Sequence, residues 1–542
     1  MRVQRWTGCL WVCLLGMAMV ACAGSNASYT RFRQASESGR TMASHEVRVA
    51  DFVNRFAQED ASPAVLDSAD ASALYVDARI ANPHLPREGA TALLGVTLRG
   101  LPRTVRMAAD LVVVIDVSGS MNEAGKITAV RHALARMLET LDPNDRIALV
   151  TFSDDAHLAL PLTPVGSARP LIQGAIDQLY ASGGTNIHAG LQEGVAVALG
   201  TRSDNARVVF LSDGIATSGL TGRSDILHAA SALLARHIPV TTIGVGQAID
   251  FELLEAIAED HGGAFHFVDQ PSEVERVFAT YVRSLNETSA RSVELHVRAP
   301  EGARLVRAFD QRVRIDEAGR AASVRLGDFA ASDAYVGLFE VEIAAGFAPS
   351  SVPIEVRFRT LDGVEQIVAR HDAAFGFDAS GTYEIVGLDE PGLYRAATMG
   401  YAAMGLHAAA QAEERGDVTT AEGWLRSTLI AVEAAQRQLV SADPTRAATL
   451  SEPLDLLRRS HAGVLARLPV QYEPTSYEPV ASNAVNVITE PTPPVLVIGS
   501  GAPTQVIHTQ PGVTAVPSSA VIGGPLPSSA PVAGSARFAG WR

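Results

Sequence analysis

The chain has 542 residues and a formal net charge of −15. This length is sufficient for several domains, each with its own hydrophobic core. The acidic balance argues against nucleic acid as a partner, because a phosphate backbone attracts basic surfaces. All three cysteines, Cys9, Cys13 and Cys22, lie at the start of the chain, so the remainder must be stable without disulfide bonds.

The start of the chain has the pattern of an export signal. A short basic stretch precedes a mostly apolar run, residues 6–21, which is too short for a comfortable membrane span. The small residues before Cys22 resemble the bacterial lipoprotein signal, in which the cysteine is lipidated and becomes the first mature residue, although Met19 stands where leucine is usual. The resemblance implies a signal peptide over residues 1–22 and a polar tether over residues 23–44.

Ordinary signal-peptidase cleavage is the alternative, because Ala21 and Ala23 also fit a cleavage site after residue 23. In the lipoprotein interpretation the protein is exported and held in the bacterial cell envelope by its N-terminal lipid alone. Aspartate directly after the cysteine would favour retention in the inner membrane. Ala23 stands at this position instead, which favours the outer membrane. No segment of the mature chain is apolar and long enough to span a bilayer.

Alternating apolar residues predict strands on both sides of the middle of the chain. We expect residues 45–109 to form an N-terminal β segment and residues 289–378 to form a β-sandwich. The alternating positions are Leu74, Val76, Ala78 and Ile80; Leu94, Val96 and Leu98; Val293, Leu295 and Val297; Phe339, Val341 and Ile343; and Ile354, Val356 and Phe358. One interpretation is a single sandwich built from both flanks with another domain inserted between its strands, and two unrelated β units are the alternative.

The middle of the chain alternates between short apolar runs and helical patterns. Strands are predicted at residues 111–115, 147–152, 208–211, 240–245 and 265–268. Helices are predicted at residues 122–141, 192–199, 226–237, 251–259 and 272–285. This alternation predicts a doubly wound, mostly parallel sheet with helices on both faces.

Polar residues follow two of these strands and a glycine-rich loop. The first strand runs into Asp116, Ser118 and Ser120, the loop presents Thr185, and the third strand leads to Asp213. In open α/β sheets, ligands bind at the carboxyl ends of the strands. All five side chains offer oxygen, which suits hard divalent cations such as Mg²⁺ or Ca²⁺.

The three motifs, Asp116-x-Ser118-x-Ser120, Thr185 and Asp213 in the context Leu-Ser-Asp-Gly, resemble the metal-ion-dependent adhesion site of the von Willebrand factor A (VWA) domain. The resemblance implies a Rossmann-like VWA domain over residues 110–288. It implies that Ser118, Ser120 and Thr185 bind Mg²⁺ (or Mn²⁺ or Ca²⁺) directly or nearly so, and that Asp116 and Asp213 act largely through water. One coordination position is left for an Asp or Glu of a protein partner.

Alternatives to a working adhesion site remain. Aspartate, serine and glycine often cap helices without any metal, and an envelope scaffold can retain a structural or idle metal site. An enzyme is not expected. Neither Ser118 nor Ser120 lies in a G-x-S-x-G elbow and no histidine has positional support as a partner, so a hydrolase is the less favoured class.

The segments before and after the predicted VWA domain carry further sequence patterns. Residues 45–56 and 82–89 resemble a bacterial VWA lipoprotein subgroup named after calcium-activated chloride channel proteins, which is no evidence of a channel. Residues 390–468 are predicted to be helical and resemble one tetratricopeptide-like helix pair, with a plain hairpin or three-helix unit favoured because one repeat cannot bury a solenoid core. Residues 471–542, rich in Pro, Ser, Gly and Val, are predicted to be disordered or extended.

Overall fold

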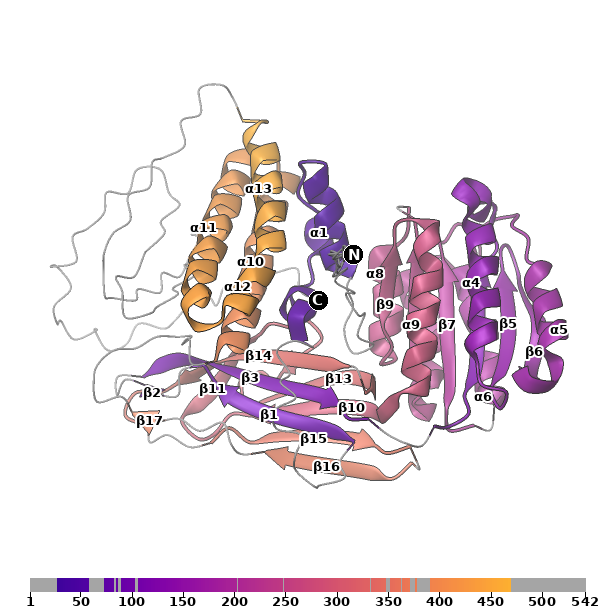
Figure 1. The fold of residues 1–542 in the computed structure, drawn as a ribbon, viewed down its shortest axis with the longest axis horizontal. Helices are drawn as coiled ribbons and strands as arrows, with labels where there is room; N and C mark the ends of the chain where they lie inside the picture. Colours follow the sequence, from indigo (N-terminus) through magenta and orange to yellow (C-terminus); the bar gives the residue numbers. More distant parts are fainter. Residues whose placement is uncertain are drawn as a thin grey trace, which may run out of the picture.

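The computed structural model describes residues 27–57, 73–81, 84–85, 89–102, 106–201, 203–246, 248–331, 333–347, 351–361, 363–370, 376–377 and 390–468. They form an α/β domain, a two-sheet β-sandwich beside it, and a helical layer that packs on the sandwich (Figure 1). The expected signal peptide with Cys22, the first residues of the tether and the tail 471–542 lie outside the described residues. Among the described helices, none combines the length and the apolar character that crossing a membrane would require.

The sandwich is built from both flanks of the α/β domain, as the single-sandwich interpretation predicts. One sheet has the strand order β1-β3-β14-β11 and the other has the order β12-β13-β10-β15-β16. The strands are β1 Leu74–Ile80, β3 Ala90–Gly100, β10 Thr288–Arg298, β11 Ala303–Ala308, β12 Arg314–Ile315, β13 Ala321–Ala330, β14 Ala334–Ile343, β15 Ile354–Arg359 and β16 Glu365–Arg370. A small parallel pair, β2 His84–Leu85 and β17 Gly376–Phe377, also joins the two flanks.

Alternation along β3 places its side chains in two different cores. Leu94, Val96 and Leu98 pack in the sandwich core, which also contains Leu295 of the opposing sheet. Leu93 packs in the core between this sheet and the helical layer. Because successive side chains of a strand point to opposite faces, the four-stranded sheet is covered on both sides.

The α/β domain contains a six-stranded sheet in the order β6-β5-β4-β7-β8-β9. All its neighbouring strands pair in parallel except the edge strand β6, which is antiparallel to β5. The strands are β4 Asp110–Asp116, β5 Arg146–Phe152, β6 Ala156–Pro164, β7 Ala206–Ser212, β8 Val240–Val245 and β9 Phe265–Val268. The helices are α4 Lys126–Thr140, α5 Val165–Asp177, α6 Ile187–Gly200, α7 Arg223–Ala230, α8 Phe251–Asp260 and α9 Val274–Asn286.

The central strand β4 shows how both faces of this sheet are covered. Leu111, Val113 and Ile115 pack in one core with α4, α5 and α9. Val112 and Val114 pack in the other core with α6, α7 and α8. A strand buried on both faces is apolar at every position rather than at alternate ones, so the predicted doubly wound fold is confirmed.

Two elements of this domain are absent from the sequence prediction. β6 lies at the sheet edge, where Leu160 is buried but Leu158 is exposed, so its apolar pattern is not that of a buried strand. α5 contains Pro170 within its length, and proline inside a helical pattern normally signals a helix end.

The helical layer combines elements from both ends of the described chain. α10 and α11 form the predicted hairpin, α13 packs on α11, and α1 packs on α13. The helices are α1 Ala27–Glu37, α2 Val49–Val53, α10 Pro391–Glu414, α11 Val418–Ala442, α12 Pro444–Thr449 and α13 Ser451–Leu465. The arrangement agrees with the three-helix alternative and adds two N-terminal helices to it.

These N-terminal helices correct two predictions, the tether over residues 27–44 and the β segment over residues 45–57. Tyr29, Phe32 and Phe52 are buried and contact one another in the core of the helical layer. The buried face of α1 also contains serines with hydrogen-bond partners, since Ser28 Oγ donates to the Glu46 carbonyl and Ser36 Oγ to the Phe32 carbonyl. Because its buried face is partly polar, the sequence of α1 resembles an exposed linker.

The chain enters and leaves the α/β domain side by side. Ser289 Oγ, at the start of β10, donates to the carbonyl of Leu101, just after β3, at 2.5 Å. Arg106 Nε, before β4, donates to Asn286 Oδ1 at the end of α9 at 2.6 Å. Both connections therefore meet the domain at its amino edge.

Candidate functional site

The structure brings the five sequence-predicted side chains to the carboxyl edge of the α/β sheet. Asp116 is the last residue of β4, and Ser118 and Ser120 lie in the turn before α4. Asp213 follows β7 directly, and Thr185 lies two residues before α6. β4 and β7 are neighbouring parallel strands, so their following loops meet at the same edge, as expected for an open α/β sheet.

Asp116 is buried and accepts a hydrogen bond at each carboxylate oxygen. Ser118 N–H donates to Oδ1 at 2.8 Å, and Ser212 Oγ donates to Oδ2 at 2.6 Å. Burial raises the pKa of Asp116 to about 6, the hydrogen bonds from the two serines lower it, and the negative charge of Asp213 raises it. A nearby cation would favour the charged carboxylate.

A chain of oxygens leads from the first loop to the second carboxylate. The hydroxyl groups of Ser118 and Ser120 are 3.1 Å apart, and Ser120 Oγ donates to Asp213 Oδ1 at 2.9 Å. The other oxygen of this carboxylate, Oδ2, accepts from Lys126 Nζ at 2.6 Å. Both carboxylates thus have protein partners at both oxygens, which leaves hydroxyl oxygens as the freer donors for a cation.

Thr185 is held between the other two loops. Its N–H donates to Thr217 Oγ1 at 2.9 Å, and its carbonyl accepts from Thr217 N–H at 2.9 Å. A Cβ atom added at Gly214 would lie 3.6 Å from Thr185 Oγ1 and 4.0 Å from Ser120 Oγ. The Thr185 hydroxyl therefore lies on the same side of Gly214 as the serine hydroxyl.

A glycine allows the loop before Thr185 to approach the first loop. The Gly183 carbonyl accepts from Gly119 N–H at 3.0 Å. Gly183 has a φ of +81°, and a Cβ atom here would lie 2.6 Å from Asp154 Oδ2. A larger residue would be strained both by its backbone conformation and by this contact.

The donor set fits a hard divalent cation. It contains three hydroxyls and two carboxylates and no sulfur or nitrogen ligand, which is the ligand class preferred by Mg²⁺, Mn²⁺ and Ca²⁺. Within the described part of the chain, no cluster of three or more His, Cys, Asp and Glu side chains is arranged to hold a metal. A metal at this edge would therefore depend on the hydroxyls of Ser118, Ser120 and Thr185.

Sequence reasoning missed two residues that complete the network. Ser212 lies within the Leu-Ser-Asp-Gly motif and bonds Asp116, and Lys126 is the only lysine of the chain and bonds Asp213. The serine of the motif and the single lysine are both visible in the sequence, but only the fold shows which carboxylate each side chain contacts.

Large apolar side chains are exposed in the loops of the site. Tyr180 is 71% exposed, Ile215 is 56% exposed and Leu220 is 52% exposed. Tyr180 immediately precedes the loop that carries Thr185, while Ile215 and Leu220 belong to the loop after Asp213. Exposed aromatic and aliphatic side chains beside a polar centre are typical of protein interfaces.

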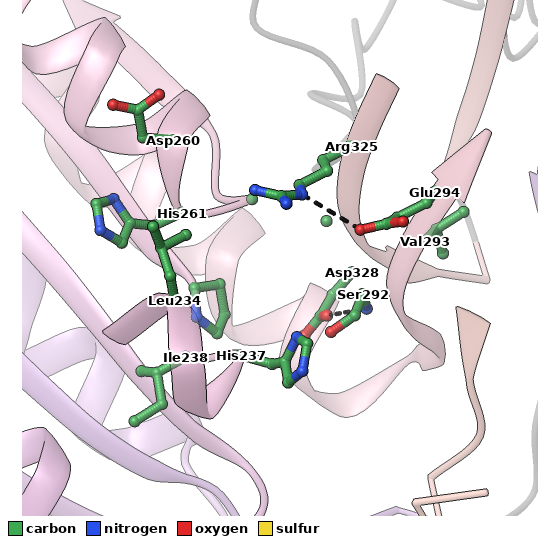
Figure 2. A pocket seen from close by; sticks show the side chains of 13 residues that line it. Leu234, His237, Ile238, Asp260, His261, Ser292, Val293, Glu294, Arg325 and Asp328 are labelled. Atoms are coloured by element: carbon green, nitrogen blue, oxygen red, sulfur yellow. Dashed lines mark hydrogen bonds and ion pairs between the residues drawn. The ribbon is translucent and has the colours of Figure 1, made fainter. Parts of the chain in front are cut away.

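A separate cavity of about 190 Å³ lies where the amino edge of the α/β sheet meets the sandwich (Figure 2). Arg325 Nε donates to Glu294 Oε1 at 3.2 Å, and Ser292 N–H donates to Asp328 Oδ1 at 2.9 Å. His237 and Ser292, which line the cavity, both have a φ of +51°. The cavity belongs to the joint between the domains and contains none of the five site residues.

Comparison with known proteins agrees with this fold. Residues 110–280 match the family model of the von Willebrand factor type A domain. A solved structure described as von Willebrand factor type A from Catenulispora acidiphila superposes with a TM-score of 0.55 at 17% identity, covering 68% of this chain and 88% of that chain. At this identity the likeness shows the fold alone.

Two curated relatives each match part of the chain. The chain is 29% identical to the uncharacterized protein YfbK of Escherichia coli over 193 residues, which is 35% of this chain and 33% of YfbK. It is 31% identical to inter-alpha-trypsin inhibitor heavy chain H1 of Mesocricetus auratus over 166 residues, which is 29% of this chain and 18% of that protein. The matches thus span a third or less of either relative.

Proposed function

Residues 110–280 form a von Willebrand factor type A domain, a type of protein-interaction and adhesion module, and on that premise we propose a metal-dependent binding function. In this proposal the protein is lipid-anchored in the bacterial cell envelope through Cys22. It holds Mg²⁺, Mn²⁺ or Ca²⁺ at the edge of the VWA sheet and binds an acidic side chain of a protein partner. The proposal is of a binding protein and not of an enzyme.

The observation that carries the proposal is the convergence of three separate loops on one oxygen-rich centre. Ser118, Ser120 and Thr185 would hold the cation through their hydroxyls. Asp116 and Asp213 would act mainly through water, because each of their carboxylate oxygens already accepts a hydrogen bond from the protein. Turn chemistry alone does not require all three loops to present oxygen at the same place.

The charge of the site favours an acidic ligand. The protein part of the site has a net charge of −1 when the carboxylates of Asp116 and Asp213 and the ammonium group of Lys126 are all ionised. A divalent cation therefore retains positive character, and an Asp or Glu of a partner would both complete its coordination and neutralise it. The cation supplies the electrostatic attraction, and the protein supplies its position.

The exposed apolar side chains indicate what surrounds that acidic residue. Tyr180, Ile215 and Leu220 would contact apolar side chains on either side of the partner's Asp or Glu, since burying apolar surface next to a polar anchor is how many interfaces gain affinity. We therefore propose a partner segment with one acidic residue between apolar neighbours.

Metal titration tests the site without any partner. In isothermal titration with Mg²⁺ and Mn²⁺, wild type is expected to bind one equivalent, and Asp116→Asn is expected to lose at least tenfold in affinity because a buried charge is removed from the network. Asp155→Asn is the matched control, since Asp155 is exposed and lies outside the network. Equal affinities for all three proteins would show that the site is idle.

Partner capture tests the binding surface. The wild-type chain in detergent, with Mg²⁺, is compared with the same chain in EDTA, with Ile215→Ala, and with Ile367→Ala. Ile367 lies on β16 of the sandwich and is 57% exposed, almost the same as Ile215. The proposal predicts that EDTA abolishes capture of the partner. It also predicts that Ile215→Ala, but not Ile367→Ala, lowers the affinity for the partner about tenfold, which is within the range of interface hot spots. A partner retained in EDTA would favour the scaffold alternative.

A further inference from the structure

Lys126 is the only lysine of the chain, and its ammonium group lies inside the candidate site. Nζ is 2.6 Å from Asp213 Oδ2 and 3.5 Å from the carbonyl oxygen of Ser120. The Asp213 side chain is fully buried, and the Lys126 side chain is 12% exposed. A positive charge is therefore built into the ring of oxygens.

The fold fixes this lysine in place. Lys126 is the first residue of α4, so its backbone is held by the helix. Its side chain passes Gly246 at the end of β8, where an added Cβ atom would lie 3.3 Å from Lys126 Cε. The stem packs against main chain, and the ammonium group points at Asp213 instead of into solvent.

A fixed positive charge at this position has opposite effects on two binding steps. It repels a divalent cation that binds the neighbouring hydroxyls, because like charges at close range raise the free energy of the bound state. It attracts an acidic ligand that binds to that cation, because the centre then carries one more positive charge. It also compensates the buried carboxylate of Asp213, which would be costly to leave unpaired.

We propose that Lys126 is a positioning residue with two linked roles. It stands in for the cation at Asp213 when no metal is bound, so the site keeps its shape at the expense of metal affinity. Once a metal is bound, it strengthens the hold on an acidic ligand. This inference rests on the proposed metal-dependent function and adds to it a residue that sets the balance between the two binding steps.

The test measures both steps in the full chain in detergent, for wild type, Lys126→Met and Lys126→Arg. Mn²⁺ affinity is obtained from the electron paramagnetic resonance signal of the free ion. Acetate serves as the acidic probe, and its binding to the Mn²⁺-saturated protein is followed by water-proton relaxation, with sodium chloride at equal ionic strength as the control. Lys126→Met is expected to bind Mn²⁺ about tenfold more tightly and acetate about tenfold more weakly, as removal of one nearby charge implies. Lys126→Arg keeps the charge and is expected to follow wild type.

Opposite changes in the two affinities separate this role from a merely structural one. If Lys126→Met lowers both affinities or changes neither, the inference is wrong while the metal site stands. If wild type itself binds no Mn²⁺, the proposed function fails, and the inference fails with it.

Thermal melting provides the second measurement if Lys126→Met is unstable without metal. The variant is expected to melt at a lower temperature than wild type in EDTA and to recover in Mn²⁺, because the cation then replaces the missing ammonium group. A loss of stability that Mn²⁺ does not restore would contradict the stand-in role. Lys126→Gln, which also lacks the charge, is expected to behave in the same way.

Discussion

Two buried histidines of the VWA domain differ in the hydrogen-bond partners of their ring nitrogens. His261, at the end of α8, has both ring nitrogens within 2.9 Å of backbone carbonyl oxygens. His266, in β9, is also buried, but its Nδ1 has no hydrogen-bond partner among the described residues. Burial, with a smaller contribution from the positive charge of Arg276, lowers the pKa of His266 to about 4.

The pH dependence of stability follows from that shift. The folded protein keeps His266 neutral down to about pH 4, whereas the unfolded chain protonates it near pH 6.5. Protons therefore favour the unfolded state as the pH falls from 6.5 to 4, and this group alone is expected to lower the free energy of unfolding by about 2 kcal/mol between pH 7 and pH 5.

Urea denaturation at pH 7 and pH 5 measures this effect. His266→Gln is expected to reduce the loss of stability at pH 5 by that amount, whatever its effect at pH 7. His157→Gln, a change at an exposed histidine on β6, is expected to leave the difference unaltered. An unchanged difference in His266→Gln would show that other groups cause the acid sensitivity.

Two elements meet at the joint between the VWA domain and the sandwich through main chain alone. Gly262 lies in the turn after α8 and Gly327 lies within β13. A Cβ atom at Gly327 would lie 1.8 Å from the carbonyl oxygen of Gly262. The two backbones are therefore in direct contact, and only glycine at residue 327 permits this approach.

Two glycine substitutions can separate the loss of stability caused by disrupting that contact from the loss caused by backbone strain. Gly327 has a φ of +79° and Gly363, in the turn between β15 and β16, has a φ of +82° with open space around its Cβ position. Gly363→Ala is expected to cost about 1 kcal/mol from conformation alone, and Gly327→Ala is expected to cost about 3 kcal/mol or more because the domains must also separate. Thermal melting of both variants checks the difference, and equal losses would show that the joint tolerates a methyl group.

The sequence predicts elements best where their pattern depends on local burial. Residues 111–115 of β4 and 208–211 of β7 are continuously apolar because both faces of these strands are covered. Four of the five site residues lie at or just after the ends of these two strands, and Thr185 lies in the glycine-rich loop before α6. α1 was missed because its buried face includes Ser28 and Ser36, whose partners come from elsewhere in the chain. Lys126 was missed for a similar reason, since its pairing with Asp213 joins residues 87 positions apart.

At the scale of the whole molecule, a buried charge network holds the VWA domain against the N-terminal helices. Arg48, next to α2, forms ion pairs with Glu255 and Glu259 of α8, and its guanidinium group is also 3.7 Å from Asp51. Burial raises the pKa of Glu255, and the positive charge of Arg48 lowers it. The guanidinium carbon of Arg31, in α1, lies 4.0 Å from the ring centroid of Phe267 in β9. Figure 1 shows α1 standing between α13 and the α8–β9 edge of the VWA domain.

Removing the central cation of this network tests whether it holds the two parts together. Arg48→Met is expected to cost about 3–5 kcal/mol because it leaves buried carboxylates without a counter-charge, and hydrogen exchange is expected to rise in α2 and α8 together. Arg223→Met is the control, since Arg223 also pairs with a glutamate of α8 but the pair is half exposed, and exposed pairs contribute at most about 1 kcal/mol. Faster exchange in α8 alone would show that the contact does not couple the two parts.

The way in which the VWA domain is connected to the sandwich has a mechanical consequence. Its two connections run into β3 and β10, which are each 11 residues long and lie in the interior of different sheets. The two connections lie side by side, and the Arg48 network and the Gly262–Gly327 contact hold the same domain against the helical layer and the sandwich. A partner that pulls on the opposite edge therefore loads both strands along their length. Under such a load a strand must slide past its neighbours and break many ladder hydrogen bonds at once, instead of opening them one after another, so the sandwich is arranged to carry tension.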